Sequence, residues 1–369
     1  MKSDFAGELA FDRELLLSRL VQEARGKRQG DHFRKSSGRY LLCGADESSM
    51  KGVWKMKPYA FGIDIGGTTV KCGFFNSDGT FVEKWEIPTR KEDDGAMILP
   101  DIAEAIKAKL AEHKVSMEDV EGIGVGVPGP VLDDGVVNGC VNLGWGVFNV
   151  AEKLSGLLGD VTVQVGNDAN VAALGEQWHG GGKGFKNVVM VTLGTGVGGG
   201  IIIGGRILAG SHGAGGEIGH IQMRKNETAV CGCGKKGCLE QYASATGIVR
   251  MSKLLLEKDK RESSLRSLAE ITSKDIFDAA KTGDALSLKL VDTLGEMLGT
   301  ALAHITAVVD PDVIVIGGGV SKAGQILIDA IEKHYRPTAF HACRNTQFKL
   351  AVLGNDAGMY GAVRMILNS

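Results

Sequence analysis

One succession of elements occurs twice in this sequence, and it restricts the possible folds more than any other feature. A short apolar run at 59–65 is interrupted by Gly66-Gly67-Thr68, continues at 69–75, turns at 76–79 and leads into a third strand at 80–87. The same pattern returns as strands at 187–193, 200–203 and 206–208, with glycine turns at 194–196 and 204–205. Strands and helices follow each set. We therefore predict two similar α/β lobes that face one another.

The remaining elements are predicted from their apolar spacing. In the first half we expect helices at 96–113 and 169–178 and buried strands at 120–127 and 161–165. In the second half we expect helices between 244 and 309, a strand at 312–316 followed by a helix, a last strand at 349–353 and a closing helix at 356–367. The small lobe should comprise 56–172 together with 355–369, and the large lobe 173–354.

The first 55 residues differ from the rest of the 369-residue chain. Only 11–25 has helical spacing, and 26–55 is polar and basic with no sustained period. We interpret 1–55 as a flexible leader or extension. Its origin has three alternatives: a native segment, a product of cloning, or a misassigned start of the sequence. The segment is too short and too poorly patterned for a DNA-binding domain.

The composition is that of an ordinary soluble globular protein, with 43% hydrophobic and 23% charged residues. A net charge of −2 gives no electrostatic footprint for nucleic acid or for an anionic membrane. The stretch 187–205 lacks charge and is long enough to span a bilayer, but its glycines favour a strand–loop–strand structure. No secretory signal is visible, and the remaining cysteines are scattered, which fits a reducing, cytoplasmic compartment.

Three of the 7 cysteines lie within eight positions, and a histidine stands eleven residues upstream of the first. A disulfide is the main alternative, but Cys231 and Cys233 are too close for a typical pair, and three is an odd number. Three thiolates and one imidazole form a complete tetrahedral ligand set for Zn²⁺, with no position left open for catalysis. We therefore predict a structural zinc site at His220, Cys231, Cys233 and Cys238.

Glycine is unusually frequent, with 54 residues, about twice the usual ~7% share. Clustered glycines let backbone N–H groups gather around a phosphate. The first such loop contains Gly66, Gly67, Thr68 and Thr69, whose hydroxyls add donors. Asp64, at the strand end, offers a carboxylate for Mg²⁺, directly or through water. A plain hairpin turn is the alternative for this motif.

A second loop contains Gly194, Thr195 and Gly196. It matches the dinucleotide pattern G-x-G-x-x-G, but a β-branched run follows instead of a helix, so we reject a dinucleotide fold. We predict a β-hairpin phosphate loop that pairs with the first, one from each lobe. Gly318 and Gly319 follow a strand and open a helix. This position suits contact with a nucleoside, and the alternative is that the glycines only allow close packing of the helix on the strand.

Polar side chains in the loops suggest a sugar. Asn167 and Asp168 stand between a strand and a helix, where either could cap the helix, or Asp168 could act as a general base in phosphoryl transfer. The local pattern does not separate these roles. Four further polar residues would together suit the hydroxyls of a hexose, with exposed polar loops as the alternative: Asn142, Glu217, His220 and Glu240.

Taken in order, these motifs resemble the ROK family of sugar kinases and repressors, and most of all its bacterial glucokinases. The resemblance extends from about Met56 to Ser369. It also includes Val127-Pro128-Gly129-Pro130 and the loop Asn142-Leu143-Gly144-Trp145.

The resemblance implies an actin/hexokinase-like ATPase fold of two lobes around a cleft, built from duplicated RNase H-like domains. It implies ATP, Mg²⁺ and Zn²⁺, a homodimer or homotetramer, and transfer of a phosphoryl group to the 6-hydroxyl of a hexose. By family correspondence Asp168 is the catalytic base. Thr69 stands where many members carry Lys, and Lys71, on the same face of the strand, offers a charge instead. The implied sugar ligands are Asn142, Asn167, Asp168, Glu217, His220 and Glu240.

We interpret the chain as an ATP-dependent hexose kinase, a glucokinase. A kinase for N-acetylmannosamine, fructose or allose is the alternative within this class, and a sugar-responsive transcriptional repressor is the alternative outside it. The sequence does not fix the phosphoryl donor among ATP, ADP and polyphosphate.

Overall fold

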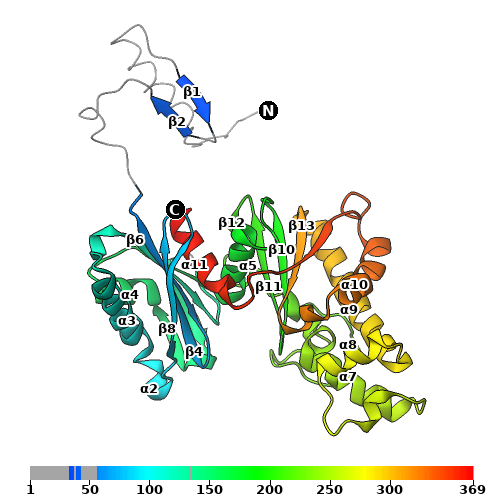
Figure 1. The fold of residues 1–369 in the computed structure, drawn as a ribbon. Helices are drawn as coiled ribbons and strands as arrows, with labels where there is room; N and C mark the ends of the chain where they lie inside the picture. The colour runs from blue at the N-terminus through cyan, green and yellow to red at the C-terminus, as the bar shows by residue number, and fades with distance from the viewer. Residues whose placement is uncertain (1–32, 37–38, 43–55, 133, 369) are drawn as a thin grey trace, which may run out of the picture. The chain divides into compact units, whose positions relative to one another are not determined.

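The computed structural model describes residues 33–36, 39–42, 56–132 and 134–368 (Figure 1). The chain divides into two units between Lys55 and Met56. The first unit contains an antiparallel hairpin of β1 (Phe33–Ser36) and β2 (Arg39–Leu42). We expected no regular element at 26–55, because its polar, basic composition has no sustained period. The helix predicted at 11–25 lies outside the described residues.

The second unit is built on two five-stranded mixed sheets with the same strand order. The first has the order β5-β4-β3-β6-β9 and the second β12-β11-β10-β13-β14. In each sheet three antiparallel strands are followed by two strands that run parallel to the first of them. The shared order and directions confirm the prediction of a duplicated α/β fold.

The first sheet is formed by β3 (Tyr59–Ile65), β4 (Thr69–Asn76), β5 (Phe81–Pro88), β6 (Val120–Val127) and β9 (Val163–Asn167). The second is formed by β10 (Val188–Leu193), β11 (Val197–Ile203), β12 (Arg206–Ile207), β13 (Val313–Gly317) and β14 (Gln347–Leu350). A separate hairpin pairs β7 (Val136–Cys140) with β8 (Trp145–Asn149).

The helices of the second unit are α2 (Glu92–Gly95), α3 (Ile98–His113), α4 (Val150–Leu157), α5 (Asp168–His179), α6 (Glu240–Ala243), α7 (Ala245–Lys258), α8 (Ser273–Lys281), α9 (Ala285–Val309), α10 (Gln325–Thr338) and α11 (Ala357–Leu367). Short 3-10 helices are η2 (Met117–Asp119), η3 (Val141–Leu143), η4 (Ile218–His220), η5 (Ser264–Ser267), η6 (Gly319–Ala323) and η7 (Gly354–Asp356).

Each sheet buries both faces because its strands alternate apolar side chains between two helical layers. In the first sheet, one face packs on α3 and α4 and the other on α11. In the second, one face packs on α7 to α10 and the other on α5. Helices α5 and α11 therefore form the inner layer, and they contact each other between the two sheets (Figure 1).

Glycines bring α5 and α11 unusually close together. A Cβ added at Gly175 would lie 2.1 Å from the carbonyl oxygen of Ala357, and one at Gly361 would lie 1.7 Å from that of Val171. No side chain fits at either position, so the helix backbones themselves are in contact. The boundary expected between residues 172 and 173 falls inside α5, a continuous helix that contacts strands of both sheets.

A buried carboxylate fixes the chain where it returns from the second sheet to α11. Glu176 on α5 is 0% exposed. Its carboxylate accepts hydrogen bonds from the backbone N–H of Gly181 at 2.7 Å, Leu353 at 2.8 Å and Val352 at 3.1 Å. A Cβ at Gly180 would lie 1.9 Å from Glu176 Oε2. One side chain thus satisfies the backbone donors of two connections.

Most predicted elements are present, and the differences have local causes. β11 begins at Val197, because Val197 pairs with Leu193 directly across the turn; the glycines that follow hid this part of the strand. The last strand covers 347–350 rather than 349–353. Gly319 opens the short helix η6, and α10 begins only at Gln325. The uncharged stretch 187–205 forms strands, and no helix among the described residues is long and apolar enough to cross a membrane.

The Glu176 contacts lead to a stability prediction. Glu176→Ala should lower the free energy of unfolding by about 3 kcal/mol, since it removes a fully buried carboxylate that accepts from three part-buried N–H groups. Urea unfolding followed by circular dichroism measures this. Glu104→Ala on the exposed face of α3 is the control and should leave the unfolding midpoint unchanged. A Glu176→Ala protein as stable as this control would show that the carboxylate does not hold the connection.

Candidate functional site

The candidate site begins at the carboxyl ends of three neighbouring strands of the first sheet. In the register of the sheet Asp64 pairs with Gly126, and Val127 pairs with Asn167. Asp64, the Pro128-Gly129 turn and Asn167-Asp168 therefore meet at one edge of the sheet. In open α/β sheets this edge is where ligands bind.

The start of α5 assigns separate tasks to the two residues that sequence alone could not distinguish. Asn167 is the N-cap, and its Oδ1 accepts from the backbone N–H of Ala169 at 3.0 Å and Asn170 at 3.2 Å. Its Nδ2 donates to the carbonyl of Gly129 at 3.1 Å. Asp168 Oδ1 accepts from the N–H of its neighbour Ala169 at 2.7 Å, and among the described residues no hydrogen bond reaches its Oδ2. A ligand hydroxyl can therefore approach Asp168 Oδ2.

The surroundings of Asp168 make it a stronger base than an ordinary aspartate. Burial raises its pKa from 3.8 to about 6, and the negative charges of Asp64 and Glu217 act in the same direction. The bond from Ala169 opposes the shift only in part. A carboxylate with a pKa near 6 is ionised at neutral pH and holds a proton better than a free one. Asp64 and Glu217 thus add negative charge to the surroundings of Asp168.

The first glycine loop joins β3 and β4 and carries an ion pair at its base. The N–H of Gly66 donates to the carbonyl of Thr69 at 3.0 Å and closes the turn. Lys71 Nζ lies 3.6 Å from Asp64 Oδ2, because the two residues are paired across the strands. Burial raises the pKa of Asp64, and Lys71 partly counters this. Lys71 thus offers its charge beside Asp64.

The second glycine loop has the same position in the second sheet. Gly194, Thr195 and Gly196 form the turn between β10 and β11, so the rejection of a dinucleotide fold is supported by two paired strands with no helix. A Cβ at Gly318, where φ is +82°, would lie 2.5 Å from the backbone of Leu193. Gly318 therefore needs to be glycine, and it brings the third glycine loop against the end of β10, next to Gly194.

The glycine run on β11 lets two other parts of the site approach the second loop. A Cβ at Gly200 would lie 2.8 Å from the carbonyl of Ala169 in the first turn of α5, and one at Gly199 would lie 2.5 Å from the carbonyl of Gly216. The base-bearing helix and the loop that carries Glu217 are thus both packed on β11.

Two cavities extend from the second loop along α7 and α8. One of about 450 Å³ is lined by Thr195, Ala245, Thr246, Lys253 and Ser273 among others. A second of about 160 Å³ reaches Gly319 on η6. Its lysines, which sequence patterns did not single out, are Lys274, Lys281 and Lys322. The two cavities share Ser273, and their linings are mainly apolar, with lysines among the lining residues.

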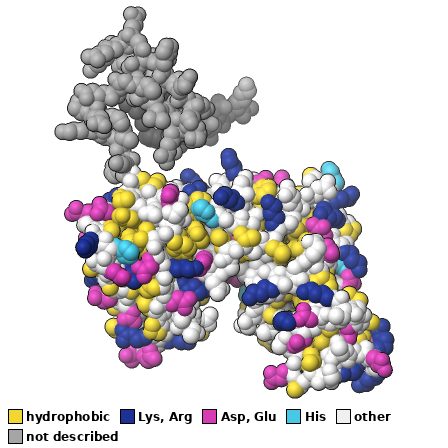
Figure 2. All heavy atoms as spheres, viewed as in Figure 1, with side chains coloured by type: hydrophobic (Ala, Val, Ile, Leu, Met, Phe, Trp, Pro, Cys, Tyr) yellow, Lys and Arg dark blue, Asp and Glu magenta, His cyan; other side chains and the backbone are white. Residues whose placement is uncertain are grey.

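The surface is deeply notched between the two halves of residues 56–368 (Figure 2). Asn142 lies in η3 with an exposed side chain. Its loop is held by Cys140, whose thiol donates to the carbonyl of Pro128 at 2.7 Å, and by Trp145, whose Nε1 donates to the carbonyl of Gly95 at 3.2 Å.

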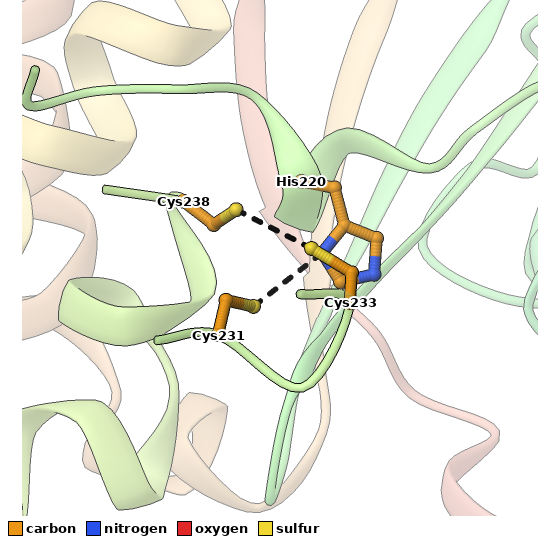
Figure 3. A group of neighbouring side chains, drawn as sticks. All are labelled: His220, Cys231, Cys233 and Cys238. Carbon is orange, nitrogen blue, oxygen red and sulfur yellow. Dashed lines mark hydrogen bonds between the residues drawn. The ribbon is translucent and has the colours of Figure 1, made fainter. Parts of the chain in front are cut away.

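The four predicted zinc ligands converge (Figure 3). Their ligand atoms all lie within 4.8 Å of one another. Cys233 Sγ and Cys238 Sγ are 3.6 Å apart, and His220 Nδ1 is 3.8 Å from Cys231 Sγ. Sulfur ligands at about 2.3 Å from a tetrahedral zinc would be roughly 3.8 Å apart. The cysteines are free thiols, so the donor set fits Zn²⁺ in both chemistry and size.

A polar network around Glu227 lies next to the cluster. Tyr242 donates to Glu227 at 2.6 Å, and Arg250 donates to the same carboxylate at 3.1 Å. Burial alone would raise the pKa of Glu227, but bonds from Tyr242, the Ala229 N–H and Arg250 lower it to about 2. Gln241 accepts from the N–H of Cys238 at 3.1 Å. No sequence motif pointed to these residues, because their partners are distant in the chain.

The histidine of the cluster faces two ways. Its Nδ1 is directed at Cys231, and its Nε2 lies 3.8 Å from Glu217 Oε2. The carboxylate of Glu217 is half exposed. His220 therefore connects the cluster to Glu217, and through the charge of Glu217 to Asp168.

A model described as the ROK family matches residues 60–369. The chain belongs to the ROK family. A glucokinase of Halalkalibacterium halodurans is 46% identical over 312 residues, which cover 81% of this chain and 92% of that protein. A ROK glucokinase from Streptomyces griseus, solved with glucose and AMPPNP, is 32% identical with a TM-score of 0.66 and covers 84% of this chain and 100% of its own.

The ROK family also contains regulators that resemble this chain in structure. A ROK transcriptional regulator, a homologue of the Escherichia coli MLC protein, has a TM-score of 0.74 at 26% identity and covers 84% of this chain and 78% of its own. The likeness to ROK kinases confirms the expected actin/hexokinase-like fold.

The raised pKa of Asp168 predicts a stability effect in this ROK protein. A shift from 3.8 to about 6 corresponds to at most about 3 kcal/mol of destabilisation once the carboxylate is ionised. Asp168→Asn should therefore be more stable than the wild type near pH 8. The advantage should shrink as the pH falls through 6 and disappear well below pH 3.8, where the folded and unfolded states both carry a neutral group. Urea unfolding at several pH values measures it.

Asp160→Asn, in the exposed turn before β9, is the matched control and should not gain stability near pH 8. An Asp168→Asn protein with no gain at alkaline pH would show that Asp168 is well solvated and has no raised pKa.

Proposed function

We propose that this ROK protein is a glucokinase that transfers the γ-phosphoryl group of ATP to the 6-hydroxyl of D-glucose. The observation that carries the proposal is the position of Asp168 at the start of α5. There Asp168 is a partly buried carboxylate that is not the N-cap, and the next residue of the helix, Ala169, packs against Gly200 on β11. The similarity to a glucokinase at 46% identity over most of both chains supports the choice of sugar.

In the proposed reaction Asp168 orients the 6-hydroxyl of the sugar and accepts its proton as the oxygen attacks the γ-phosphorus. The pKa of about 6 suits this task, because the carboxylate is ionised at neutral pH yet is a better proton acceptor than a solvated aspartate. Asn167 holds the first turn of α5 and the Gly129 turn, and so fixes the direction of the base.

The two glycine hairpins would hold the phosphates. The proposed donors are the backbone N–H groups of Gly67, Thr195 and Gly196 and the hydroxyls of Thr68, Thr69 and Thr195. The N–H groups of Gly66 and Gly194 instead close their own turns. Asp64 is placed to hold Mg²⁺ directly or through water, and this ion would neutralise charge on the phosphoryl oxygens. Lys71 adds a cation beside Asp64. The cavities along α7, α8 and η6 would take the nucleoside, with Gly319 in the lining and Gly318 next to it.

We propose that the sugar is held by Asn142, Asn167, Glu217, His220 and Glu240 around Asp168. Carboxylates and an imidazole nitrogen can each bond to ring hydroxyls, and a missing hydroxyl would leave a buried group unpaired. Zn²⁺ bound by His220 and the three cysteines would fix the loops that carry these groups.

Several further properties are part of the proposal. We infer that 56–172 with 355–369 and 173–354 act as two lobes that close on the substrates, that 1–55 is an extension, that the protein is cytoplasmic, and that it forms a homodimer or homotetramer. The described cysteines are free thiols, which fits a reducing compartment.

A sugar-responsive repressor is the second candidate, favoured by the structural likeness to a ROK regulator. That function needs a DNA-binding domain in addition to the ROK fold. A kinase for another hexose, such as N-acetylmannosamine, fructose or allose, would use the same base and differ in the sugar loops.

The proposal is tested by a coupled assay with ATP across a panel of hexoses. The wild type should phosphorylate glucose with the highest kcat/KM. Asp168→Asn should lower kcat by roughly 10²–10⁴-fold and still bind glucose, since it removes the proton acceptor but keeps a polar group of the same shape. Asp160→Asn should be fully active.

Preference for another hexose would overturn glucose as the substrate while leaving the kinase intact. Near-normal turnover by Asp168→Asn would remove Asp168 from the role of base. DNA binding without turnover on any sugar would favour the repressor.

A further inference from the structure

The segment that follows the last cysteine of the cluster is bonded to the second glycine loop at three places. Glu240 Oε2 accepts from the N–H of Val197 at 3.0 Å. The N–H of Ala245 donates to the carbonyl of Gly194 at 2.8 Å, and the hydroxyl of Thr246 donates to the carbonyl of Thr195 at 2.6 Å. The turn between β10 and β11 is thus bonded by α6 and the first turn of α7 at three of its four residues from 194 to 197.

The close approach of Glu240 explains the glycine at the end of the turn. A Cβ at Gly196 would lie 2.2 Å from Glu240 Oε2. Gly196 has no positive φ that would require glycine, but a side chain there would displace the carboxylate of Glu240 from this position. The turn and the carboxylate are built to fit one another.

The same carboxylate reaches the cysteine–histidine cluster with its other oxygen. Cys231 Sγ lies 3.6 Å from Glu240 Oε1, and Cys238 precedes Glu240 by two residues. The histidine side of the cluster also touches the turn, because a Cβ at Gly219, next to His220, would lie 2.2 Å from the carbonyl of Val197. Both segments that carry cluster ligands therefore contact Val197.

These contacts form a continuous connection from the cluster to the loop. Ser244 Oγ donates to the carbonyl of Glu240 at 2.7 Å and accepts from the N–H of Gly247 at 2.9 Å, so it caps α7 and fixes its start relative to α6. A shift of the cysteine loop would therefore also displace Glu240 and Ala245. Loops in a ligand site gain affinity when they are held in the bound shape beforehand.

We propose that Glu240 is a positioning residue that couples the cysteine–histidine cluster to the second glycine loop, so that the state of the cluster controls nucleotide binding as well as sugar binding. The proposal rests on the proposed function, because it takes this loop as the phosphate site. Without the four-ligand cluster in place the turn loses its fixed shape, and the nucleotide must order it on binding.

The test uses the full-length protein with its zinc content measured, before and after removal of the metal with a chelator. Binding of AMPPNP is measured by calorimetry with no sugar present, so that effects on sugar binding do not enter. Removal of zinc should raise the Kd about tenfold or more, the scale expected for losing one hydrogen bond to a charged group. Hydrogen exchange of the peptide containing 194–197 should become faster.

Glu240→Gln, with zinc still bound, should weaken AMPPNP binding by a similar factor without sugar. It keeps the size of the side chain but removes the negative charge, so the N–H of Val197 donates to a neutral amide oxygen in a weaker hydrogen bond. Glu257→Gln, exposed on α7, is the control for loss of charge and should bind AMPPNP as the wild type does.

Each outcome is decisive. Unchanged AMPPNP affinity in Glu240→Gln overturns the coupling, even if the metal-free protein unfolds and cannot be measured. Unchanged exchange at 194–197 in folded metal-free protein also overturns it, whatever the loop binds. Failure of the untreated protein to bind AMPPNP overturns the proposed function itself, and with it the nucleotide part of the coupling.

Discussion

The hydrogen bonds from Asn167 to the first turn of α5 are the interaction on which the rest of the site depends. A helix N-terminus leaves several backbone N–H groups without partners, and a nearby carboxylate would normally take them. Asn167 caps the helix by accepting from Ala169 and Asn170, and Asp168 shares the N–H of Ala169 through one oxygen, Oδ1. It remains in a buried, negatively charged position where its pKa rises to about 6. The amide of Asn167 thus caps the helix, and the carboxylate of Asp168 remains available for chemistry.

The same helix joins the two halves of the fold. Its backbone touches α11 where glycines remove the side chains, and Glu176 at its other end holds the connection that returns to α11. The base at one end of α5 and the buried carboxylate at the other are therefore carried by one rigid element. Movement of the second sheet relative to the first would have to act through this helix pair, since α5 packs on the second sheet and α11 on the first.

Much of the fold could be predicted from sequence, because strand–glycine–strand patterns depend on local residues. The 59–65 and 120–127 strands have the predicted bounds. The predicted start of β11 and the predicted helix at Gly319 were wrong. The glycines in these segments are required by packing against residues distant in the sequence, namely Ala169, Gly216 and Leu193. The paired strands β1 and β2 have no apolar alternation that would predict them.

The parts of the candidate site that depend on local residues could likewise be predicted, and those that depend on distant contacts could not. The four cluster ligands could be named because their spacing reveals the chemistry, and their atoms converge in the structure. The role of Glu240 at Val197, the Glu227–Tyr242–Arg250 network and the lysines of the proposed nucleotide cavities could not, because each depends on contacts between segments far apart in the chain. Sequence patterns also left the tasks of Asn167 and Asp168 open, and only the hydrogen bonds at the start of α5 distinguish them.

The most direct measurement of the central claim is a crystal structure of the wild-type protein with glucose and AMPPNP. The account predicts that a carboxylate oxygen of Asp168 lies within about 2.6–3.2 Å of the glucose 6-oxygen, with that oxygen pointing at the γ-phosphorus between the two glycine loops. An Asp168 carboxylate turned away from the 6-hydroxyl, or a γ-phosphate bound away from both loops, would contradict it.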